Sequence, residues 1–351
     1  METKTLIVGG GLSGLVLAET LEARGQDYLL VEARDRFGGR ILSASHGGAQ
    51  FDMGPAWFWP GQPRIAAMIE RLGLVRFDQF ATGDLTFQDH TGQVQRGRGF
   101  ASMEGSWRLA GGLSALTDAL AARLPDTRKR LNAQVVQLAR TGARVTASLG
   151  AGEAIVADCV VLTLPPRIAA GLAFDPPLPP EALAAMGRVP TWMAGQAKAV
   201  AIYNTPFWRD VGLSGDGMSR FGPMVEIHDA SPADYTCGAL FGFIGVPPED
   251  RLEEAALRAQ VLSQLGRLFG PEATTPIALH IKDWAQDPFT ATQADAIAQN
   301  AHPLYGLPPE LSQLWDRRLI LSGTETAPQF GGFLEGAFGA VELTLDMLDH
   351  V

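Results

Sequence analysis

The chain of 351 residues is long enough for about two domains of ordinary size and for a large buried core. Hydrophobic residues make up 46% of it and charged residues 19%, which excludes disordered, collagen-like and coiled-coil proteins. The formal net charge is −10, so the average field of the protein repels a phosphate backbone. We therefore expect no nucleic-acid partner.

Cysteine content and the first residues bear on the compartment. Cys159 and Cys237 are the only cysteines, and they stand in unrelated contexts, which is typical of a reducing compartment. The N-terminus runs directly into an apolar strand, and no uninterrupted run of about 18 apolar residues occurs. We predict a cytoplasmic protein with no signal peptide and no membrane span.

The first predicted elements are a strand, a glycine-rich turn and a helix. Residues 5–8 form an apolar β-run, and residues 15–21 carry apolar side chains at helical spacing. Between them, Gly9, Gly11 and Gly14 match the pattern G-x-G-x-x-G, in which the missing side chains permit a tight turn and close approach of a pyrophosphate. The start of the helix, where Ser13 lies, would then face that anion.

A second β-run over residues 28–31 ends at Glu32, which lies 18 residues after Gly14. An acid at this place can accept both hydroxyls of an adenosine ribose, and it argues against a 2′-phosphate. NAD or FAD is therefore favoured over NADP. A glycine turn that only reverses the chain is the alternative, and the ordered strand, helix and acid make it less favoured.

The run that follows, EARDRFGGR over residues 32–40, points to one of the two dinucleotides. It resembles the start of flavin-containing amine oxidases of the monoamine oxidase type. The resemblance implies that Glu32 binds the adenosine ribose of FAD and that Arg34, Gly39 and Arg40 help to hold its pyrophosphate. The alternative for the two arginines is a solvated loop charge.

Residues 51–60 form an aromatic loop, and residues 64–72 read as an amphipathic helix. The loop is similar to the one that passes beside the flavin ring in this family, which implies cofactor contacts for Gly54, Pro55 and Ala56 and a place in the pocket for Trp57. Amino-acid oxidases of the superfamily carry an arginine near this loop. Because this chain has none there, an amino-acid substrate is less favoured.

The middle of the chain shows fewer signals. Residues 74–105 have little periodicity, so the chain resembles a compact version of the family. Helical spacing returns at residues 113–124, a strand with Val136 is expected near the adenine, and residues 155–164 read as a buried strand. The proline-rich run at 175–180 is stiff enough to be a crossing between domains.

Beyond that crossing we expect a strand at 197–203, a helix at 253–269 and a strand at 277–281. Residues 319–325 then form a buried strand with a glycine turn, and residues 336–348 a terminal helix. This ending is similar to the C-terminal FAD signature of the family. The resemblance implies cofactor contacts for Gly323, Glu325, Phe333 and Leu334, and also for Trp284.

Lys198 is the principal catalytic candidate. Alternation along its strand puts it on one face with Val200 and Ile202. An ammonium group among such apolar side chains is unusual and calls for an explanation. A snorkelling lysine at a strand end is one interpretation. The resemblance implies another, in which this strand delivers a lysine to the flavin and the lysine holds a water beside atom N5.

Two facing aromatic rings flank the amine in monoamine oxidases. By resemblance Phe333 takes one of these positions, whereas Ala294 stands at the other and Gln293 stands where some members carry a flavin-linked cysteine. FAD should thus be non-covalent, and the incomplete cage weakens the case for a simple primary amine. Four tryptophans could reshape the pocket or simply pack: Trp57, Trp107, Trp192 and Trp284.

We therefore predict an α/β fold with a Rossmann-type FAD-binding domain and a smaller α+β substrate domain. The first would comprise residues 1–75, 105–179 and 285–351, and the second residues 76–104 and 180–284. The predicted catalytic residues are Lys198, Phe333 and Trp57. No metal site is expected, because the six histidines show no H-x-x-x-H pair.

The predicted activity is oxidation of an amine by hydride transfer to flavin N5, with O2 as acceptor and an imine or aldehyde and H2O2 as products. One alternative is an FAD-dependent dehydrogenase or desaturase of a non-amine substrate that uses another electron acceptor. A second is a non-catalytic FAD-binding partner protein. The substrate, the acceptor and the oligomeric state stay open.

Overall fold

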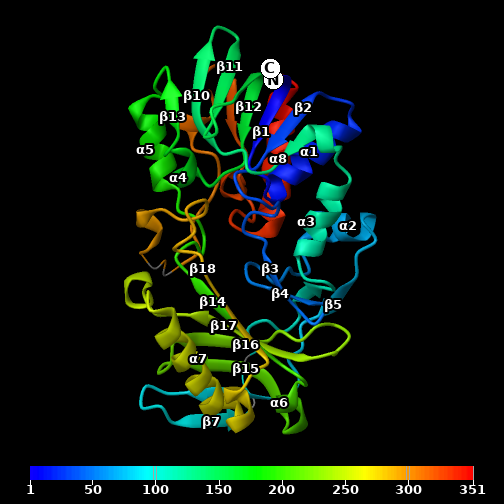
Figure 1. Ribbon diagram of the computed structural model, residues 1–351, viewed down its shortest axis with the longest axis vertical. Helices are drawn as coiled ribbons and strands as arrows, with labels where there is room; N and C mark the ends of the chain where they lie inside the picture. The colour runs from blue at the N-terminus through cyan, green and yellow to red at the C-terminus, as the bar shows by residue number, and fades with distance from the viewer. Residues whose placement is uncertain (98, 100, 298, 300, 351) are drawn as a thin grey trace.

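The computed structural model describes residues 1–97, 99, 101–297, 299 and 301–350. Two β-sheets lie at opposite ends of the molecule, and both chain termini lie beside the upper one (Figure 1). The described residues confirm the α/β fold with a Rossmann-type domain that the glycine pattern predicts.

The first sheet contains the N-terminal strand at its centre. In the described residues its order is β13-β10-β11-β12-β1-β2-β9, and β19 pairs with β12. Strand β1 is parallel to β2 and β12, and β12 is parallel to β19. The strands are β1 (Glu2–Val8), β2 (Tyr28–Val31), β9 (Lys129–Arg130), β10 (Val135–Thr141), β11 (Arg144–Leu149), β12 (Ala154–Leu162), β13 (Ala173–Asp175) and β19 (Leu319–Leu321).

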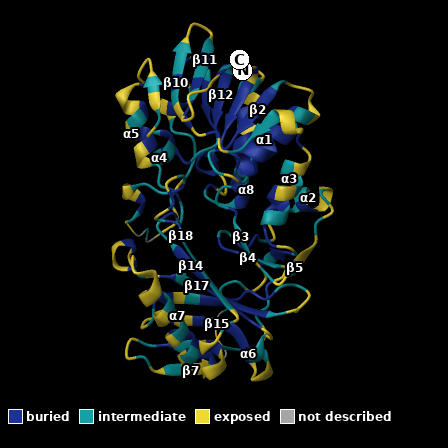
Figure 2. Cartoon of the chain, in the orientation of Figure 1, coloured by how far each residue is buried: buried dark blue, intermediate teal, exposed yellow. Residues whose placement is uncertain are grey.

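Helices cover both faces of this sheet, because successive side chains of β1 point to opposite sides. Ile7 packs in one cluster with the apolar faces of α1 (Leu12–Ala23), α2 (Pro63–Arg71), α3 (Ser114–Ala122) and α8 (Leu334–Leu348). Leu6 and Val8 pack in another, which includes residues of α4 (Pro166–Ala169) and α5 (Pro180–Arg188). Figure 2 shows the central strands β1, β2 and β12 largely buried between them.

The second sheet lies at the lower end (Figure 1). Over the described residues its order is β18-β14-β17-β16-β15-β6-β7. These strands are β6 (Asp84–Gln88), β7 (Val94–Gly97), β14 (Ala197–Tyr203), β15 (Leu213–Ser219), β16 (Met224–Asp229), β17 (Gly238–Ile244) and β18 (Ala278–Asp283). One face packs on α7 (Glu254–Phe269), and α6 (Phe207–Asp210) contacts β15 and shares that core through Trp208.

Short elements connect the two sheets. Two small two-stranded sheets lie between them: the hairpin of β3 (Ser43–His46) and β4 (Ala49–Asp52), and the pair of β5 (Arg76–Asp78) with β8 (Trp107–Leu109) (Figure 1). Short 3-10 helices lie at Asp126–Arg128, Pro248–Asp250, Pro271–Thr274, Gln293–Asp295, Pro309–Leu311 and Thr324–Thr326.

Two segments differ from the sequence-based expectation. The weakly periodic stretch 74–105 supplies β6 and β7, and β6 pairs in parallel with β15, more than 120 residues further along the chain. Helix α5, which we expected in the substrate domain, packs through Ala182, Ala185 and Met186 into the core of the first sheet. The chain therefore passes from the first sheet to the second after α5 rather than before it. The full division into domains stays a prediction.

The buried carboxylate of Glu335 links the start of α8 to the start of α2. Glu335, in the first turn of α8, is fully buried, and its oxygens accept hydrogen bonds from the backbone N–H groups of Arg64 (3.1 Å) and Ile65 (3.0 Å) at the start of α2. The Arg64 guanidinium pairs with the same carboxylate at 3.2 Å. Glu335 thus supplies the N-terminal cap that Gln62 does not provide.

We expect Glu335→Ala to lower the stability of the FAD-loaded protein by about 2–4 kcal/mol, because it leaves buried N–H groups and an arginine without their acceptor. Glu342→Ala removes another, more exposed partner of Arg64 and should cost less than about 1 kcal/mol. Urea midpoints of the two variants measure this difference. Equal midpoints would contradict the capping role.

Candidate active site

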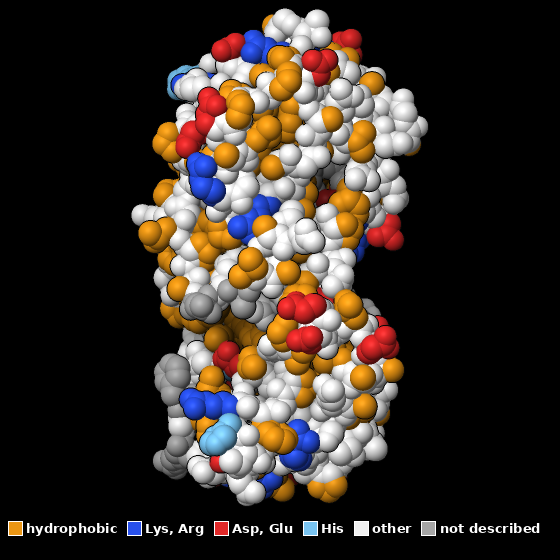
Figure 3. All heavy atoms as spheres, turned by 90° about the vertical axis from the view of Figure 1, so that its left-hand side faces the viewer, with side chains coloured by type: hydrophobic (Ala, Val, Ile, Leu, Met, Phe, Trp, Pro, Cys, Tyr) orange, Lys and Arg blue, Asp and Glu red, His pale blue; other side chains and the backbone are white. Residues whose placement is uncertain are grey.

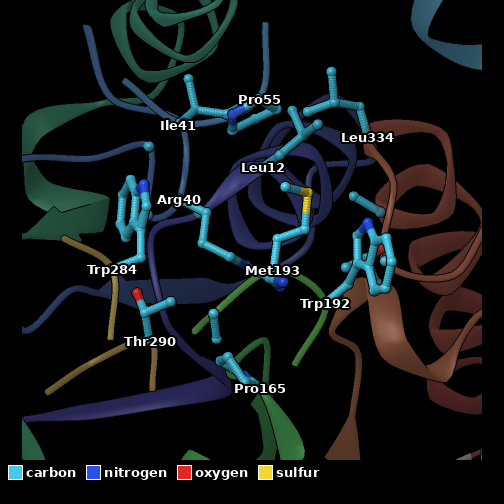
Figure 4. A pocket seen from close by; sticks show the side chains of 18 of the residues that line it. Leu12, Arg40, Ile41, Pro55, Pro165, Trp192, Met193, Trp284, Thr290 and Leu334 are labelled. Carbon is cyan, nitrogen blue, oxygen red and sulfur yellow. The ribbon is translucent and has the colours of Figure 1, made fainter. Parts of the chain in front are cut away.

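A large pocket opens between the two sheets. The segments that line it come from both ends and from the middle of the chain: 9–13, 32–41, 53–59, 163–165, 192–198, 243, 284–290, 324 and 332–337. Figure 3 shows a recess at mid-height whose visible walls are largely hydrophobic. In Figure 4, Trp192 and Trp284 stand on opposite sides of the pocket, with Arg40 and Met193 between them.

The glycine-rich turn after β1 requires its glycines. Gly9 has a φ of +111°, and a Cβ on Gly14 would lie 1.9 Å from the carbonyl oxygen of Gly9. The Thr163 hydroxyl, at the end of β12, donates to that same oxygen at 2.7 Å. A Cβ on Gly39 would come within 3.1 Å of the Gly11 Cα atom. The turn and the Gly-Gly segment therefore form one backbone cradle.

Glu32 lies at the end of β2 with 4% of its surface exposed, and it lines the pocket. One carboxylate oxygen accepts a hydrogen bond from the backbone N–H of Gly10 at 2.7 Å, and the other from that of Arg34 at 2.9 Å. The side chain thus ties the glycine turn to the next strand, and it presents negative charge to the pocket.

Neither predicted arginine is a solvated loop charge. The Arg34 guanidinium donates to Asp287 Oδ1 at 2.5 Å and to the Thr290 hydroxyl at 3.1 Å. Arg40 donates to Glu325 Oε1 at 2.6 Å. Burial alone would raise the pKa of Asp287, but a hydrogen bond from Lys282 and the charge of Arg34 hold this pKa below its usual value. Both arginines therefore connect the first forty residues to segments near the C-terminus.

Sequence reasoning missed Arg36, which organises the loop between them. Its guanidinium donates to the carbonyl oxygens of Phe37, Gly39 and Ile41. A positive φ at Gly38 and Gly39 turns these carbonyls toward it. The signal was present, since three arginines recur in the same nine-residue run.

Glu325 carries an orphaned atom. It is fully buried, and its Oε2 atom has no hydrogen-bond partner among the described residues. The glycine cradle and the acid at the end of β2, which both line the pocket, suit a ligand that has phosphates and several hydroxyl groups. The residues present thus fit a dinucleotide such as FAD.

Lys198 lies on β14 with 3% of its surface exposed. Its Nζ atom donates to the Gly54 carbonyl oxygen at 3.0 Å and lies 4.0 Å from the centroid of the Phe241 ring. Val200 and Ile202 share this face, as the alternation predicts. Burial lowers the pKa of Lys198 to about 7, and the nearby Asp52 carboxylate opposes this effect.

Asp52 is a second site residue that sequence reasoning missed. It is buried at the end of β4, where it accepts hydrogen bonds from the Leu113 backbone N–H at 2.8 Å and from the Ser43 hydroxyl at 3.1 Å. Burial raises its pKa, although Lys198 and these donors act in the opposite direction. The charges of Asp52 and Lys198 thus interact at the wall of the pocket, which Lys198 lines.

Aromatic rings form most of the remaining wall. Trp57 donates from Nε1 to Gln79 Oε1 at 2.8 Å and packs against Phe241 with centroids 4.9 Å apart. Trp284 donates to the Met53 carbonyl oxygen at 2.9 Å. Lining rings are Trp57, Trp59, Trp192, Phe243, Trp284, Phe289 and Phe333. Trp107 lies elsewhere, where it packs under the Arg76 guanidinium at 3.8 Å.

Sequence analysis compared two positions with the facing aromatic rings of monoamine oxidases, and only one of them lies in the pocket. Phe333, just before α8, lines it. Ala294 and Gln293 are exposed in a 3-10 turn that is fixed by its neighbour Asp295, whose carboxylate accepts from Arg167 at 2.5 Å. Neither residue is among those that line the pocket.

Most of the predicted site residues lie together. Lining the pocket are Gly9, Gly11, Ser13, Glu32, Arg34, Gly39, Arg40, Gly54, Pro55, Ala56, Trp57, Lys198, Trp284, Phe333 and Leu334. Gly14, Gly323 and Glu325 lie behind this surface. Val136 does not line it and is 40% exposed, because the irregular start of β10 turns Val135, instead, into the core.

The described residues contain no group of three or more His, Cys, Asp or Glu side chains arranged to hold a metal ion. Within the same residues, no helix has both the length and the apolar character needed to cross a membrane.

Comparison with known proteins identifies the family. Residues 88–340 match the model of the flavin-containing amine oxidoreductases, and residues 7–72 match an NAD(P)-binding Rossmann-like domain. The chain belongs to the flavin-containing amine oxidoreductase family. It is an FAD-dependent oxidoreductase of the amine oxidase type, and its FAD is held non-covalently.

Individual relatives match along nearly the whole chain. AofH of Mycobacterium tuberculosis is 27% identical, over 95% of this chain and 93% of its own. The L-amino acid dehydrogenase of a Synechocystis species is 23% identical, over 95% of this chain and 92% of its own. The structure of putrescine oxidase bound to putrescine superposes with a TM-score of 0.82 at 20% identity, over 99% of each chain, which shows the shared fold.

We expect Glu32→Ala to weaken FAD retention at least 10-fold, because it removes both the pocket carboxylate and the bond that holds the Gly10 amide. Flavin absorbance that stays with the protein during dialysis measures this, with Glu153→Ala at an exposed position as the control. Full flavin occupancy in Glu32→Ala would count against a role for this side chain in cofactor binding.

Proposed function

We propose that this flavoprotein oxidises an amine with O2 as the electron acceptor, releasing H2O2. FAD, when bound, takes a hydride equivalent from the carbon next to the amine nitrogen and passes the two electrons to the acceptor. The substrate leaves as an imine, which water hydrolyses to a carbonyl compound and an amine or ammonia. The observation that carries the proposal is the buried Lys198 amine inside an aromatic pocket beside the Gly54 loop.

Lys198 supplies a proton-accepting group to this pocket. With a pKa of about 7, a large fraction of its Nζ atoms are neutral at physiological pH. A neutral amine can accept a proton from the substrate ammonium, directly or through a water, and only the deprotonated amine has the nitrogen lone pair that assists hydride loss. Asp52 limits how far the pKa falls, so the group can still be reprotonated.

The aromatic wall would orient the substrate and exclude water. Trp57 and Trp284 are held by hydrogen bonds from their indole nitrogens, so their ring positions are set before a ligand arrives. Together with Phe333, these rings give the pocket an apolar surface that suits an apolar substituent on the amine.

A cytoplasmic location belongs to this proposal and is supported by two free thiols, Cys159 and Cys237.

A second candidate keeps the cofactor and changes the substrate and acceptor. It is a dehydrogenase or desaturase of a non-amine that does not use O2. The exposed position of Ala294 favours it, because the second ring of an amine cage is missing there. A non-catalytic FAD-binding role is the third, and a buried lysine in the pocket speaks against it.

An anaerobic screen of amines, monitored by bleaching of the flavin absorbance, tests these candidates. We expect at least one amine to reduce the flavin, and air to reoxidise the photoreduced protein within seconds. No reduction by any amine in a broad panel would reject amine oxidation. Reoxidation that takes many minutes would reject O2 as the physiological acceptor.

Lys198→Met should slow turnover or reoxidation about 100-fold while FAD stays bound, because the pocket loses its titratable amine. In the wild type the rate should rise with pH through about 7, as the neutral form of Lys198 accumulates, and then level off. The variant should lack this rise. Lys4→Met, on an exposed face of β1, is the control. Unchanged rates and an unchanged pH profile in Lys198→Met would remove its role.

A further inference from the structure

A buried histidine packs against two aromatic rings that lie beside Lys198. His228, on β16, is 2% exposed. Its imidazole meets the Trp57 indole edge to face, with ring centroids 5.2 Å apart and planes at 82°. It also lies 5.5 Å from the ring centroid of Phe241, its cross-strand partner on β17. Trp57 lines the pocket, so His228 reaches the pocket wall through a neighbouring ring.

Both nitrogens of His228 face a carboxylate. Nδ1 lies 2.6 Å from Oδ1 of Asp216 on β15, and Nε2 lies 3.0 Å from Oε1 of Glu226 on β16. Because an ionised carboxylate only accepts hydrogen bonds, both ring nitrogens have to donate, which requires the imidazolium form. Burial alone would lower the pKa of His228, but its hydrogen bonds to Asp216 and Glu226 raise this pKa above its usual value. These two carboxylates form a clamp around the ring.

The clamp leaves the imidazole little freedom. Glu226 Oε1 also accepts a hydrogen bond from the Ser102 hydroxyl at 2.5 Å, which ties the clamp to the segment before β8. Beside it lies a cavity of about 10 Å³, the size of a single water. Asp216 lines this cavity, and its Oδ2 atom has no hydrogen-bond partner among the described residues. So small a space does not let the ring turn away, and His228 stays where the two carboxylates hold it.

The rings that His228 touches keep Lys198 dry. The Nζ atom of Lys198 lies 4.0 Å from the ring centroid of Phe241 and 5.7 Å from that of Trp57. Burial is the largest cause that lowers the pKa of Lys198 to about 7, while the Asp52 carboxylate opposes it and the Arg108 guanidinium adds to it. If the two rings moved away, water would reach Nζ and favour its charged form.

His228 is the polar anchor that these two rings share. The Trp57 indole is fixed at its nitrogen by the hydrogen bond to Gln79. The Phe241 ring has no polar atom, so packing holds it, with its centroid 4.9 Å from that of Trp57. The imidazole contacts both rings and is itself held by two charged hydrogen bonds, which are stronger than neutral ones. Its removal would therefore loosen both rings together.

We propose that His228 is a positioning residue, which holds the Trp57 and Phe241 rings against Lys198 and so keeps water away from its amine. This inference deepens the proposed function and rests on it, because there the neutral amine of Lys198 accepts a proton. Dry surroundings favour the neutral amine, so two fixed rings keep Lys198 ready at neutral pH. Rings that are free to move would let the amine hold its proton to a higher pH.

A pH titration of the holoenzyme tests this role without any substrate. The charge of Lys198, in the pocket that takes FAD, perturbs the flavin absorbance, and Lys198→Met identifies the midpoint that belongs to it. We expect this midpoint near pH 7 in the wild type and about one pH unit higher in His228→Ala. Equal midpoints in these two proteins would overturn the role of His228. So would a wild-type titration without a midpoint that Lys198→Met removes.

Gln264→Leu is the matched control, because it weakens the same strand from the side of α7. Gln264 is fully buried on α7, and its side chain bonds both the N–H and the carbonyl oxygen of Met224 on β16. We expect this variant to have a lower urea midpoint of unfolding but the pH midpoint of the wild type. If Gln264→Leu moved the pH midpoint as far as His228→Ala, general loosening of the sheet would explain the change and the assignment would fall.

Two milder variants test the clamp itself. His228→Gln keeps amide N–H groups for the carboxylates and should move the pH midpoint less than half as far as His228→Ala; an equal move would show that these hydrogen bonds do not hold the rings. Glu226→Gln removes the charge of the more exposed carboxylate and keeps the ring. If His228→Ala retains no flavin, Glu226→Gln decides the matter: a midpoint raised by about half a pH unit supports the clamp, and an unchanged one rejects it.

Anaerobic reduction by an amine, followed across pH, separates this inference from the proposed function. The pH midpoint of the limiting reduction rate should follow the midpoint of the flavin absorbance in each variant. If no amine reduces the flavin while the absorbance midpoints follow the variants, amine oxidation fails and the role of His228 stands. If amines reduce the flavin with the same pH midpoint in His228→Ala as in the wild type, the role of His228 fails and amine oxidation stands.

Discussion

The buried amine of Lys198 is the constraint on which the packing of the β4 segment against the second sheet depends. A charge with 3% exposure is costly in an apolar setting unless other groups compensate for lost water. Here the compensation comes from the Gly54 carbonyl, the face of the Phe241 ring and the field of Asp52. Because Asp52 ends β4 and Gly54 lies in the loop that follows, the end of β4 and this loop must lie against β14.

The compensation is incomplete, which explains the lowered pKa of the lysine. One neutral acceptor and one ring replace the hydration of three N–H donors. Arg108, buried nearby and bonded to the carbonyls of Ala230 and Ser231, adds a further unfavourable charge. A fold that kept Lys198 fully charged would need a carboxylate in direct contact. This chain instead lets the proton leave near neutral pH.

The parts of the site that sequence analysis predicted rest either on local geometry or on the resemblance to the family, which supplied Gly54, Trp284 and Phe333. Gly9, Gly11 and Gly14 recur at fixed spacing, and the alternation along 197–203 correctly placed Lys198 with Val200 and Ile202. The missed parts depend on distant pairings. Residues 76–104 were assigned to the same domain as 180–284, but strands β6 and β7 themselves were not predicted, because no periodicity within five residues reveals a partner more than 120 residues away. Likewise, nothing near Asp52 in the sequence indicates that the fold brings it close to Lys198.

Charge is distributed unequally along the pocket, and this bears on how a substrate is received. At one end Glu32, Arg34 and Arg40 each have partners, so their charges are balanced within the protein. At the other end, among the described lining residues, Lys198 is the titratable group, and apolar rings surround it. Below pH 7 a protonated amine that approaches meets a second cation in a medium of low polarity, where repulsion is strong. Above pH 7 it meets a free base, so the burial that lowers the pKa of Lys198 also makes its surroundings able to accept an amine.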